Sequence, residues 1–327
     1  MELQSDVAIV KQNIFDLDFE GWQKWLAGIG VKKYIVKQIF DWIYLKQVYN
    51  PLEWTNVAIS TREIINQHFD YKLPEIVYSA VAADNTIKFL IKLADGKTIE
   101  SVAIPSKKRM TLCLSSQVGC AIGCTFCHTA TQGFTRNLKV HEVVGQFLVV
   151  NKFLQDNLDP AIHVNHITNI VYMGMGEPLH NFENMKTATE IFIDDQALRI
   201  GQRRVTLSTS GMVPQIEKLW DFPPINFTIS LHSAIDKTRS TLMPINKVYD
   251  VQRLIAAIKT IPLKPRRMIT FAYTLIDGVN NAQEDLDAIM NLLPKQVSKI
   301  NLIPYNEFPG SEFKRQVRKT SHGFMIS

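Results

Sequence analysis

Three of the four cysteines in this chain lie within eight residues, in the run Gly-Cys120-Ala-Ile-Gly-Cys124-Thr-Phe-Cys127-His. Thiolates on one short loop can bind three irons of a cubane cluster, whereas clusters held entirely by protein normally use four cysteines. A loop that supplies only three leaves one iron open to a substrate or cofactor, as catalytic metal sites do. The C-x3-C-x2-C spacing therefore predicts a [4Fe-4S] cluster with Cys120, Cys124 and Cys127 as metal ligands.

A disulfide framework or a structural zinc site fits the cysteine run less well. Disulfide frameworks need spread-out cysteines in a small secreted chain, but this chain has 327 residues and its first residues do not resemble a signal peptide. A structural zinc site needs a second C-x2-C pair or paired histidines further along. His128 follows Cys127, and no such pair comes after it. Zinc and a chance spacing remain the alternatives to the cluster.

Strands and helices are expected to alternate from about residue 110 onward. Short apolar runs are separated by amphipathic stretches such as HEVVGQFLVVNKFL, which is typical of parallel strands joined by crossover helices. We therefore predict an α/β fold, a partial (β/α)6 barrel over residues 109–327, with the cysteine loop after its first strand. The six expected strands are TLCLSS, NIVYMGM, RRVTLSTS, NFTISLH, MITFAYTLI and KINLIPY.

Two smaller parts precede the barrel. Apolar residues such as Trp22, Leu26 and Val36 recur at helical spacings, which predicts an N-terminal helical accessory domain over residues 1–75. The β-rich runs IVYSAVA, TIKFLIKLA and KTIESVAIP are separated by the turn sequences Ala-Asp-Asn and Ala-Asp-Gly. They predict a small antiparallel β-module, or linker, over residues 76–108.

Composition limits the class of protein. The chain is 46% hydrophobic and 20% charged, which is ordinary for a globular protein with a sizeable core. No apolar stretch of about 18 residues is present, so we expect no membrane span. Four cysteines without a signal peptide fit a reducing cytoplasm. We therefore expect a cytoplasmic protein, working as a monomer, whose net charge of +5 permits a polyanionic partner.

Conspicuous residues follow the expected strands. Taken singly, each has an ordinary role as a turn glycine, a helix N-cap or a surface histidine. In a barrel of this kind the carboxyl ends of the strands meet at one rim, so their repetition there indicates a binding site. The residues are Gly176 and Glu177 after the second strand, Ser208 in the third, Ser230, Leu231 and His232 at the end of the fourth, and Asn306 after the sixth.

Together these motifs resemble the RlmN/Cfr family of radical S-adenosylmethionine (SAM) enzymes, in particular the RlmN-type adenosine-C2 RNA methyltransferases. The likeness covers nearly the whole chain, and the glutamate of MGMGEP favours the RlmN branch. It implies a [4Fe-4S] cluster whose open iron is chelated by SAM, reductive cleavage of SAM to a 5′-deoxyadenosyl radical, and methylation of 23S ribosomal RNA and, in some members, transfer RNA. The motifs are GCAIGCTFC, QGFTRNL, MGMGEPL, RRVTLSTSG, ISLH, MPINK and IPYNEFPGSEF.

The resemblance also implies roles for single residues. It places Gly176, Glu177, Ser208, Ser230, Leu231, His232 and Asn306 around SAM. It makes Glu100 the general acid or base near the adenine, the alternative being an ordinary exposed strand glutamate. It makes Cys113 a redox cysteine, the alternative being a small buried hydrophobe.

The family's route to the product uses a further cysteine. The methyl group first moves from one SAM to a cysteine near the C-terminus, and a radical derived from a second SAM activates it for addition to adenine C2. A disulfide bond between that cysteine and the residue matching Cys113 then releases the product. This sequence ends at Ser327, before that cysteine would come: Val317–Thr320 resembles the start of the segment, and Ser321–Phe324 does not continue it.

We therefore expect a chain that binds the cluster and SAM without completing methyl transfer. Other radical SAM chemistry, or a non-catalytic RNA-binding remnant, are the alternatives. The implied partners are RNA and an unidentified one-electron donor. Short basic groups are either solvated surface charges or RNA contacts: Lys32, Lys33 and Lys37, Lys107–Arg109, Arg203–Arg204, Arg266–Arg267 and Lys314–Arg315.

Overall fold

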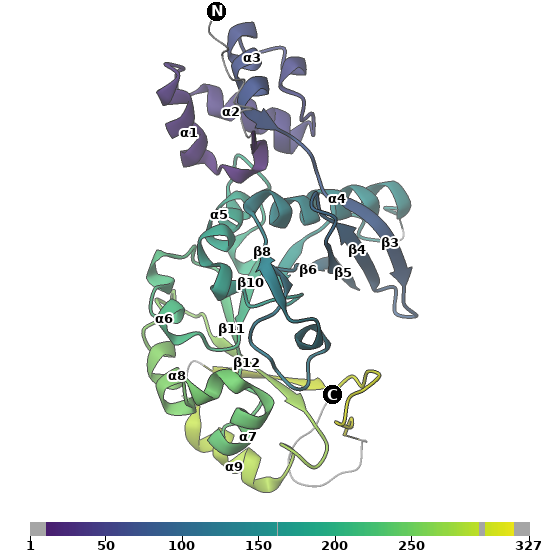
Figure 1. Cartoon of the computed structure of the whole chain (residues 1–327), viewed down its shortest axis with the longest axis vertical. Helices are drawn as coiled ribbons and strands as arrows, with labels where there is room; N and C mark the ends of the chain where they lie inside the picture. Colours follow the sequence, from purple (N-terminus) through teal and green to yellow (C-terminus); the bar gives the residue numbers. More distant parts are fainter. Residues whose placement is uncertain (1–10, 162, 294–297, 317–327) are drawn as a thin grey trace, which may run out of the picture.

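A nine-stranded sheet forms the centre of the molecule, with strand order β13-β12-β11-β10-β9-β6-β5-β4-β3 (Figure 1). The computed structural model describes residues 11–161, 163–293 and 298–316. Six neighbouring strands of the sheet are mutually parallel, and they are the six that the sequence predicts. They are β6 (Arg109–Cys113), β9 (Asn169–Tyr172), β10 (Val205–Thr209), β11 (Asn226–Ser230), β12 (Ile269–Leu275) and β13 (Ser298–Pro304).

The three strands before β6 extend this same sheet, so the antiparallel strands that the sequence predicts in this region are continuous with the barrel. The first barrel strand, β6, pairs antiparallel with β5 along one edge and parallel with β9 along the other. Both edges of β6 offer backbone donors and acceptors, so one strand can join both kinds of neighbour. The added strands are β3 (Glu75–Val81), β4 (Ile87–Lys92) and β5 (Thr98–Ser106).

Helices cover the outer face of the sheet (Figure 1). The longest, α4 (Val140–Asn157), begins where the Lys139 N–H donates to the Glu142 carboxylate (2.8 Å), which caps its first turn. It buries apolar residues such as Val143 and Phe147 toward the sheet. The others are α5 (Phe182–Ile193), α6 (Val213–Ile216), α7 (Asp236–Leu242), α8 (Val251–Ile258) and α9 (Gln283–Leu292).

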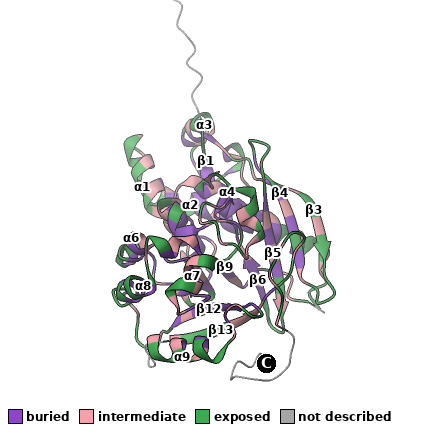
Figure 2. Ribbon diagram, turned by 60° about the horizontal axis from the view of Figure 1, so that its bottom comes forward, coloured by how far each residue is buried: buried purple, intermediate pink, exposed green. Residues whose placement is uncertain are grey.

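Burial follows this layering. Figure 2 shows buried residues along the central strands and exposed residues on the outer surfaces of the helices. In β10, for example, Val205, Leu207 and Thr209 are buried while the residues between them are half-buried. Alternation along a strand separates the side chains that pack under the helices from those on the other, concave face. The concave face is therefore the one that is free to carry polar chemistry.

An N-terminal helical module lies at one end of the molecule (Figure 1). Its core contains the Trp22 ring stacked on Phe69, with centroids 4.8 Å apart. Asp16 accepts hydrogen bonds from the backbone and the ring of His141 at the start of α4 (2.9 and 2.8 Å), which ties the module to the barrel. Its helices are α1 (Phe19–Gly28), α2 (Ile35–Phe40) and α3 (Ile59–His68), and the short strands β1 (Gln12–Asn13) and β2 (Phe69–Asp70) pair beside them.

Short elements fill the connections between the barrel strands and complete the module. The predicted domain boundaries at residues 75 and 108 stay predictions, and the tail segment 317–324 lies outside the described residues. Across the described ranges, no helix is both long and apolar enough to cross a membrane. The short elements are η1 (Ile14–Asp16), η2 (Asp41–Leu45), η3 (Pro51–Glu53), η4 (His128–Gln132), η5 (Pro178–Asn181), η6 (Gln202–Arg204), η7 (Leu219–Asp221), η8 (Pro244–Lys247) and the hairpin strands β7 (Gln117–Gly119) and β8 (Phe134–Asn137).

Candidate active site

The cysteine loop connects β7 to β8 and is fastened at both ends. The Cys120 N–H donates to the Gly133 carbonyl (2.9 Å), which closes the base of the loop. Gly119 has φ +78°, and a Cβ atom there would collide with the same carbonyl. Further along, the Thr125 N–H donates to the Leu242 carbonyl at the end of α7 (3.0 Å). The loop is therefore held against the barrel rim.

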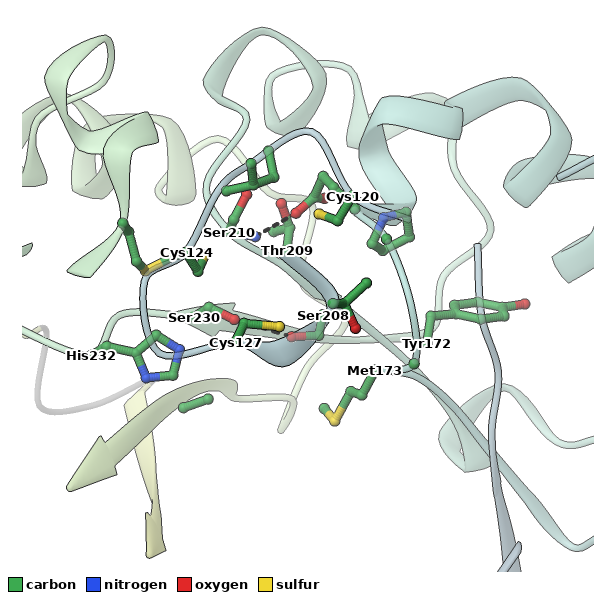
Figure 3. Close-up of a pocket in the computed structure, with 18 of the residues that line it drawn as sticks. Cys120, Cys124, Cys127, Tyr172, Met173, Ser208, Thr209, Ser210, Ser230 and His232 are labelled. Atoms are coloured by element: carbon green, nitrogen blue, oxygen red, sulfur yellow. Dashed lines mark hydrogen bonds between the residues drawn. The ribbon is translucent and has the colours of Figure 1, made fainter. Parts of the chain in front are cut away.

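Cys120, Cys124 and Cys127 line one cavity of about 250 Å³ at the carboxyl ends of the parallel strands (Figure 3). All four cysteines of the chain have free thiols. Burial raises the pKa of Cys120 and Cys124, and the neighbouring thiols of the loop add to the rise. Within the described residues, no three His, Cys, Asp or Glu side chains are gathered around a point where a single metal ion could sit.

Three sulfur donors on one cavity wall fit the ligand set of a cluster bound through three irons. The loop supplies all three from eight consecutive residues, and its thiols are close enough to affect one another's ionisation. The residues present therefore fit a [4Fe-4S] cluster, and the assignment of Cys120, Cys124 and Cys127 as its ligands becomes part of the proposal below.

Two glycines form part of the cavity wall. Gly174 and Gly176 follow β9, and both line the cavity. A Cβ atom on Gly174 would come within 2.8 Å of the Leu114 backbone, and one on Gly176 within 2.6 Å of the Gln117 side chain. Gly176 also has φ +101°, which a residue with a side chain rarely adopts. These positions let the chain pass closely over itself beside the cavity.

Glu177 carries a buried carboxyl group on the same wall. Its Oε2 accepts a hydrogen bond from the Ser210 N–H (2.7 Å), and its Oε1 accepts one from the Leu179 N–H (3.0 Å). Burial raises the pKa of Glu177, while these N–H donors act to lower it. A carboxylate has about four acceptor positions, so two bonds leave capacity for a ligand.

Serines from two adjacent strands meet on the cavity floor. Ser208 of β10 and Ser230 of β11 place their Oγ atoms 3.5 Å apart, and both line the cavity. Ser210 also lines it, and its buried Oγ lies near the Glu177 carboxylate, but it makes no hydrogen bond of good geometry to a described residue. An unsatisfied buried hydroxyl costs free energy unless a ligand or water completes it. Sequence reasoning did not single out Ser210, although it lies two residues after Ser208 in the same motif.

His232 faces the cavity with a fixed tautomer. Its Nδ1 accepts a hydrogen bond from the Thr274 N–H (2.9 Å), so in the neutral ring the proton is on Nε2. Burial lowers the pKa of His232 to about 3, and the charge of Arg239 contributes. The ring lies 4.7 Å from Phe126, the aromatic residue of the cysteine loop. His232 is therefore a neutral N–H donor beside that loop.

Two predicted SAM contacts lie outside the cavity lining. Leu231 is buried, and its N–H donates to the Ala272 carbonyl (3.0 Å), so it contributes to the strand framework. Asn306 is exposed beyond the end of β13, whereas Ile303 of the same strand lines the cavity. Sequence reasoning also missed lining residues such as Met243, whose apolar type gives no chemical signal.

Glu100 and Cys113 lie beside the cavity on the concave face of the sheet. Cys113 pairs with Val102 of β5 and Val171 of β9, and directly paired residues place their side chains on one face. Side chains alternate between the two faces along β5, so Glu100, two residues before Val102, lies on that face too. Met173, two residues after Val171, lines the cavity, so this face leads into it.

The surroundings of these two residues differ. The Glu100 side chain is 41% exposed, and Lys88 Nζ lies 2.6 Å from its Oε1. Burial raises the pKa of the Cys113 thiol to about 11, and the Met173 N–H works against that rise. The thiol is therefore uncharged at neutral pH in this structure, while Glu100 remains accessible from solvent.

Comparisons with known proteins agree with this geometry. A family model described as "Radical SAM superfamily" matches residues 114–293, and one described as "Ribosomal RNA large subunit methyltransferase N-terminal domain" matches residues 12–70. The chain is 40% identical over 284 residues to "Dual-specificity RNA methyltransferase RlmN" of Paracoccus denitrificans (strain Pd 1222), covering 86% of this chain and 73% of that protein.

A solved structure shows the same fold. The crystal structure of a radical SAM methyltransferase from Sphaerobacter thermophilus superposes with a TM-score of 0.83 at 35% identity, covering 94% of this chain and 89% of that one. Fold and site thus define a radical SAM enzyme, a class that uses a [4Fe-4S] cluster and SAM. More particularly, the chain belongs to the RlmN family of radical SAM methyltransferases. The resemblance drawn from the motifs, and with it the α/β partial barrel, is confirmed.

Proposed function

We propose that this protein is a radical SAM RNA methyltransferase that acts at C2 of adenosine in 23S ribosomal RNA and in transfer RNA. The observation that carries the proposal is that Cys120, Cys124 and Cys127 line the same cavity as Gly176 and Glu177. Family membership supports the RNA substrate, because the Paracoccus relative is named as a dual-specificity RNA methyltransferase.

Cys120, Cys124 and Cys127 would hold the cluster through three irons. A cluster bound there supplies one electron for reductive cleavage of the sulfonium bond of SAM. Cys113 is separated from this set because it lies on β6, outside the cavity lining. The loop therefore provides the metal ligands, and the fourth thiol is left for another role.

SAM would lie across the strand ends. Its amino group needs acceptors, which Glu177 offers with its remaining lone pairs. The hydroxyls of Ser208 and Ser230, together with the Ser210 Oγ, can hydrogen-bond the ribose and carboxylate oxygens. His232 Nε2–H is a donor that stays neutral across the physiological range. The roles of Leu231 and Asn306 stay predictions.

Glu100 is the candidate general acid or base for the adenine. It lies on the concave face next to the cavity and is reachable from solvent, so a base entering from the side of β5 would pass it first. The Lys88 ammonium makes an ion pair with this carboxylate, whose oxygens can accept a proton. An adenine stacked in RNA would have to be extruded to reach this position.

The edge strands provide a surface for RNA next to Glu100. Tyr78 of β3 pairs with Leu90 of β4, which in turn pairs with Glu100, so the three side chains share one face. Tyr78 is 63% exposed. Exposed aromatic residues on a sheet stack unpaired bases of RNA. This row would guide a splayed-out strand toward Glu100.

Basic residues add a separate candidate contact for RNA. Arg203, Arg204, Lys264 and Arg267 line a second cavity of about 420 Å³ at the amino ends of β10 and β12. Phosphate groups bind preferentially to such clusters of cations. We further propose a cytoplasmic monomer that receives its electron from a separate one-electron donor.

The proposal is tested by anaerobic reconstitution of the full chain with iron and sulfide. Wild-type protein is expected to bind about four irons per chain, and after reduction with dithionite to cleave SAM to 5′-deoxyadenosine. Cys124→Ala should lose iron and SAM cleavage, whereas the matched control Cys113→Ala should keep its iron. Equal iron loss in both variants, or no SAM cleavage by iron-loaded wild type, would contradict the proposed site.

The RNA substrate needs a separate readout. Adding 23S ribosomal RNA fragments or transfer RNA to the reduced, iron-loaded protein, followed by digestion and mass spectrometry, measures 2-methyladenosine directly. The same assay tests the expectation that the chain binds the cluster and SAM without completing methyl transfer. Binding of the same RNAs to the iron-loaded protein shows substrate recognition independently of methyl transfer. RNA that neither binds nor is modified would overturn the substrate assignment and leave the cluster site intact.

A further inference from the structure

Arg239 on α7 is a fully buried cation behind the cysteine loop. Its side chain is 0% exposed, and among the described residues it takes part in no ion pair. All of its hydrogen bonds go to neutral oxygens. Nε donates to Leu231 O (3.0 Å), Nη1 to Asn246 Oδ1 (2.8 Å), and Nη2 to Ser210 O (2.8 Å) and Ser230 O (3.1 Å).

These four bonds give each nitrogen of the guanidinium at least one acceptor without neutralising its charge. Moving a charged group out of water is costly in free energy, and hydrogen bonds to carbonyl groups recover only part of that cost. A buried arginine normally faces a carboxylate for this reason. Because no carboxylate of the described residues is bonded to Arg239, its charge is available to a negative group bound at the cavity.

Two groups lie near enough to favour the charged form of Arg239, and they are Cys124 and Asp236. Asp236 is an exposed carboxylate that makes no hydrogen bond to Arg239, and its Oδ1 accepts from Asn246 Nδ2 and from the Val251 N–H, both at 2.9 Å. Cys124, by contrast, lines the cavity. Burial otherwise lowers the pKa of Arg239 to about 10, so it remains a cation at neutral pH.

The position of Arg239 also matters for the rim. Through Ser210, Ser230 and Leu231 it joins the ends of β10 and β11, and through Asn246 it joins η8. The same strand ends carry the cavity-lining hydroxyls. The guanidinium thus ties α7, whose Leu242 carbonyl holds the cysteine loop, to these strand ends, and its charge is held in a fixed place.

We propose that Arg239 is the buried counter-charge of the three-cysteine site: it offsets the negative charge of a cluster bound by Cys120, Cys124 and Cys127 and favours the one-electron reduction of that cluster. The inference rests on the proposed cluster site. Three thiolates around an oxidised cluster carry one excess negative charge, which an electron from a one-electron reductant increases to two. The reduction potential of such clusters depends on the charge around them.

The same arrangement makes Arg239 a positioning residue rather than a catalytic one. It touches neither cavity nor substrate directly, and it acts through the carbonyl groups it holds and the field it produces. A structural role alone would change folding or iron uptake and leave the potential of a loaded cluster unchanged. The potential is therefore the readout that separates the two roles.

The test uses the full chain, reconstituted with iron and sulfide and titrated with dithionite while the reduced cluster is followed by electron paramagnetic resonance. Arg239→Met is expected to lower the equilibrium constant for reduction about tenfold, which corresponds to a potential about 59 mV more negative for a one-electron couple. Arg253→Met, which removes an exposed arginine from α8, is the matched control and should leave the potential unchanged. An iron-loaded Arg239→Met protein with the wild-type potential would overturn the proposal.

Arg239→Lys keeps the test decisive if Arg239→Met does not fold. Lysine retains the charge but cannot make four bonds in a planar fork, so we expect a lower melting temperature and a reduction equilibrium within about threefold of wild type. A reduction equilibrium lowered about tenfold in Arg239→Lys as well would show that position, not charge, matters, and would sink the inference. Wild-type protein that takes up no iron would instead overturn the cluster site itself.

Discussion

At the scale of single residues, the cavity depends on glycines, which have no side chain, as much as on the polar side chains beside them. Gly174 and Gly176 leave space where a side chain would meet the Leu114 backbone or the Gln117 side chain. Glu177 and Ser210 then supply polar atoms beside that space. A glycine with positive φ is therefore an informative site for substitution.

Gly176→Ala should weaken SAM binding at least tenfold, because the new methyl group displaces the Gln117 side chain and the positive φ is strained for alanine by about 1 kcal/mol. Binding of SAM to iron-loaded protein by calorimetry measures the effect. Gly201→Ala is the matched control, since a Cβ there meets nothing within 4 Å and should leave SAM affinity unchanged. Equal affinities for both variants would contradict a SAM site beside Gly176.

At the scale of elements, helix α4 and the strand ends are joined by one buried amide. Gln146 Oε1 accepts from Ser101 Oγ (2.8 Å) and from the Ser115 N–H (3.0 Å), and its Nε2 donates to Ser115 O (3.1 Å). Ser115 lies just before the cysteine-bearing hairpin and in turn donates to Glu100 O. This chain of bonds connects the helix layer, β5 and the start of the site.

Gln146→Leu should reduce the free energy of unfolding by about 3 kcal/mol, because it leaves the Ser115 backbone groups and Ser101 Oγ buried without partners. Urea denaturation of the iron-free protein measures the loss. Gln155→Leu, an exposed position on the same helix, should change stability by less than about 0.5 kcal/mol. Similar stabilities for the two variants would show that the amide does not hold the layers together.

At the scale of the whole molecule, carboxyl groups meet between the N-terminal module and the barrel. Glu190 of α5 lies beside Asp18, the N-cap of α1. Burial raises the pKa of Glu190 to about 7, and its hydrogen bond with Asp18 adds to the rise. This pair of carboxyl groups thus lies between two regions distant in sequence.

This pair predicts a pH dependence of stability. A glutamate whose pKa is raised in the fold contributes stability below its ordinary value near 4.5, and that contribution is lost as the pH rises through about 7. Glu190→Gln should therefore stabilise the protein at pH 8, by about 1 kcal/mol after allowance for partial solvent exposure, and have little effect at pH 5. Urea denaturation of wild type and Glu190→Gln at the two pH values measures the effect, with the exposed Glu183→Gln as the control. Equal stability of Glu190→Gln and wild type at pH 8 would contradict a raised pKa of Glu190.

The binding of RNA to the second, basic cavity is also a property of the whole molecule. If the second cavity contacts phosphates, the double variant Arg203→Ala, Arg204→Ala should weaken RNA binding and reduce the slope of log affinity against log salt by about two. Filter binding at several salt concentrations measures the slope. Arg253→Ala removes a surface charge elsewhere and should keep the wild-type slope. An unchanged slope in the double variant would place the RNA on another face.

Much of the site was predictable from the sequence because its signals are local. Three cysteines in eight residues, glycines beside a glutamate, and serines at strand ends are short-range patterns, and each follows a strand with clear periodicity. The order of the parallel strands also follows from the sequence, since crossover helices leave few topologies. Cys120, Cys124, Cys127, Gly176, Glu177, Ser208, Ser230 and His232 accordingly line one cavity.

Only the tertiary structure decided the rest, because it depends on contacts between distant segments. Whether β3–β5 form their own sheet or extend the barrel is determined by the two edges of β6, which no local pattern encodes. Arg239 reads in the sequence as one more charged helix residue, yet packing buries it behind Cys124. By itself, then, the sequence determined the chemistry of the cysteine loop and the fold that carries it. The tertiary structure decided which charges and faces surround that loop, because burial is a property of the packed chain.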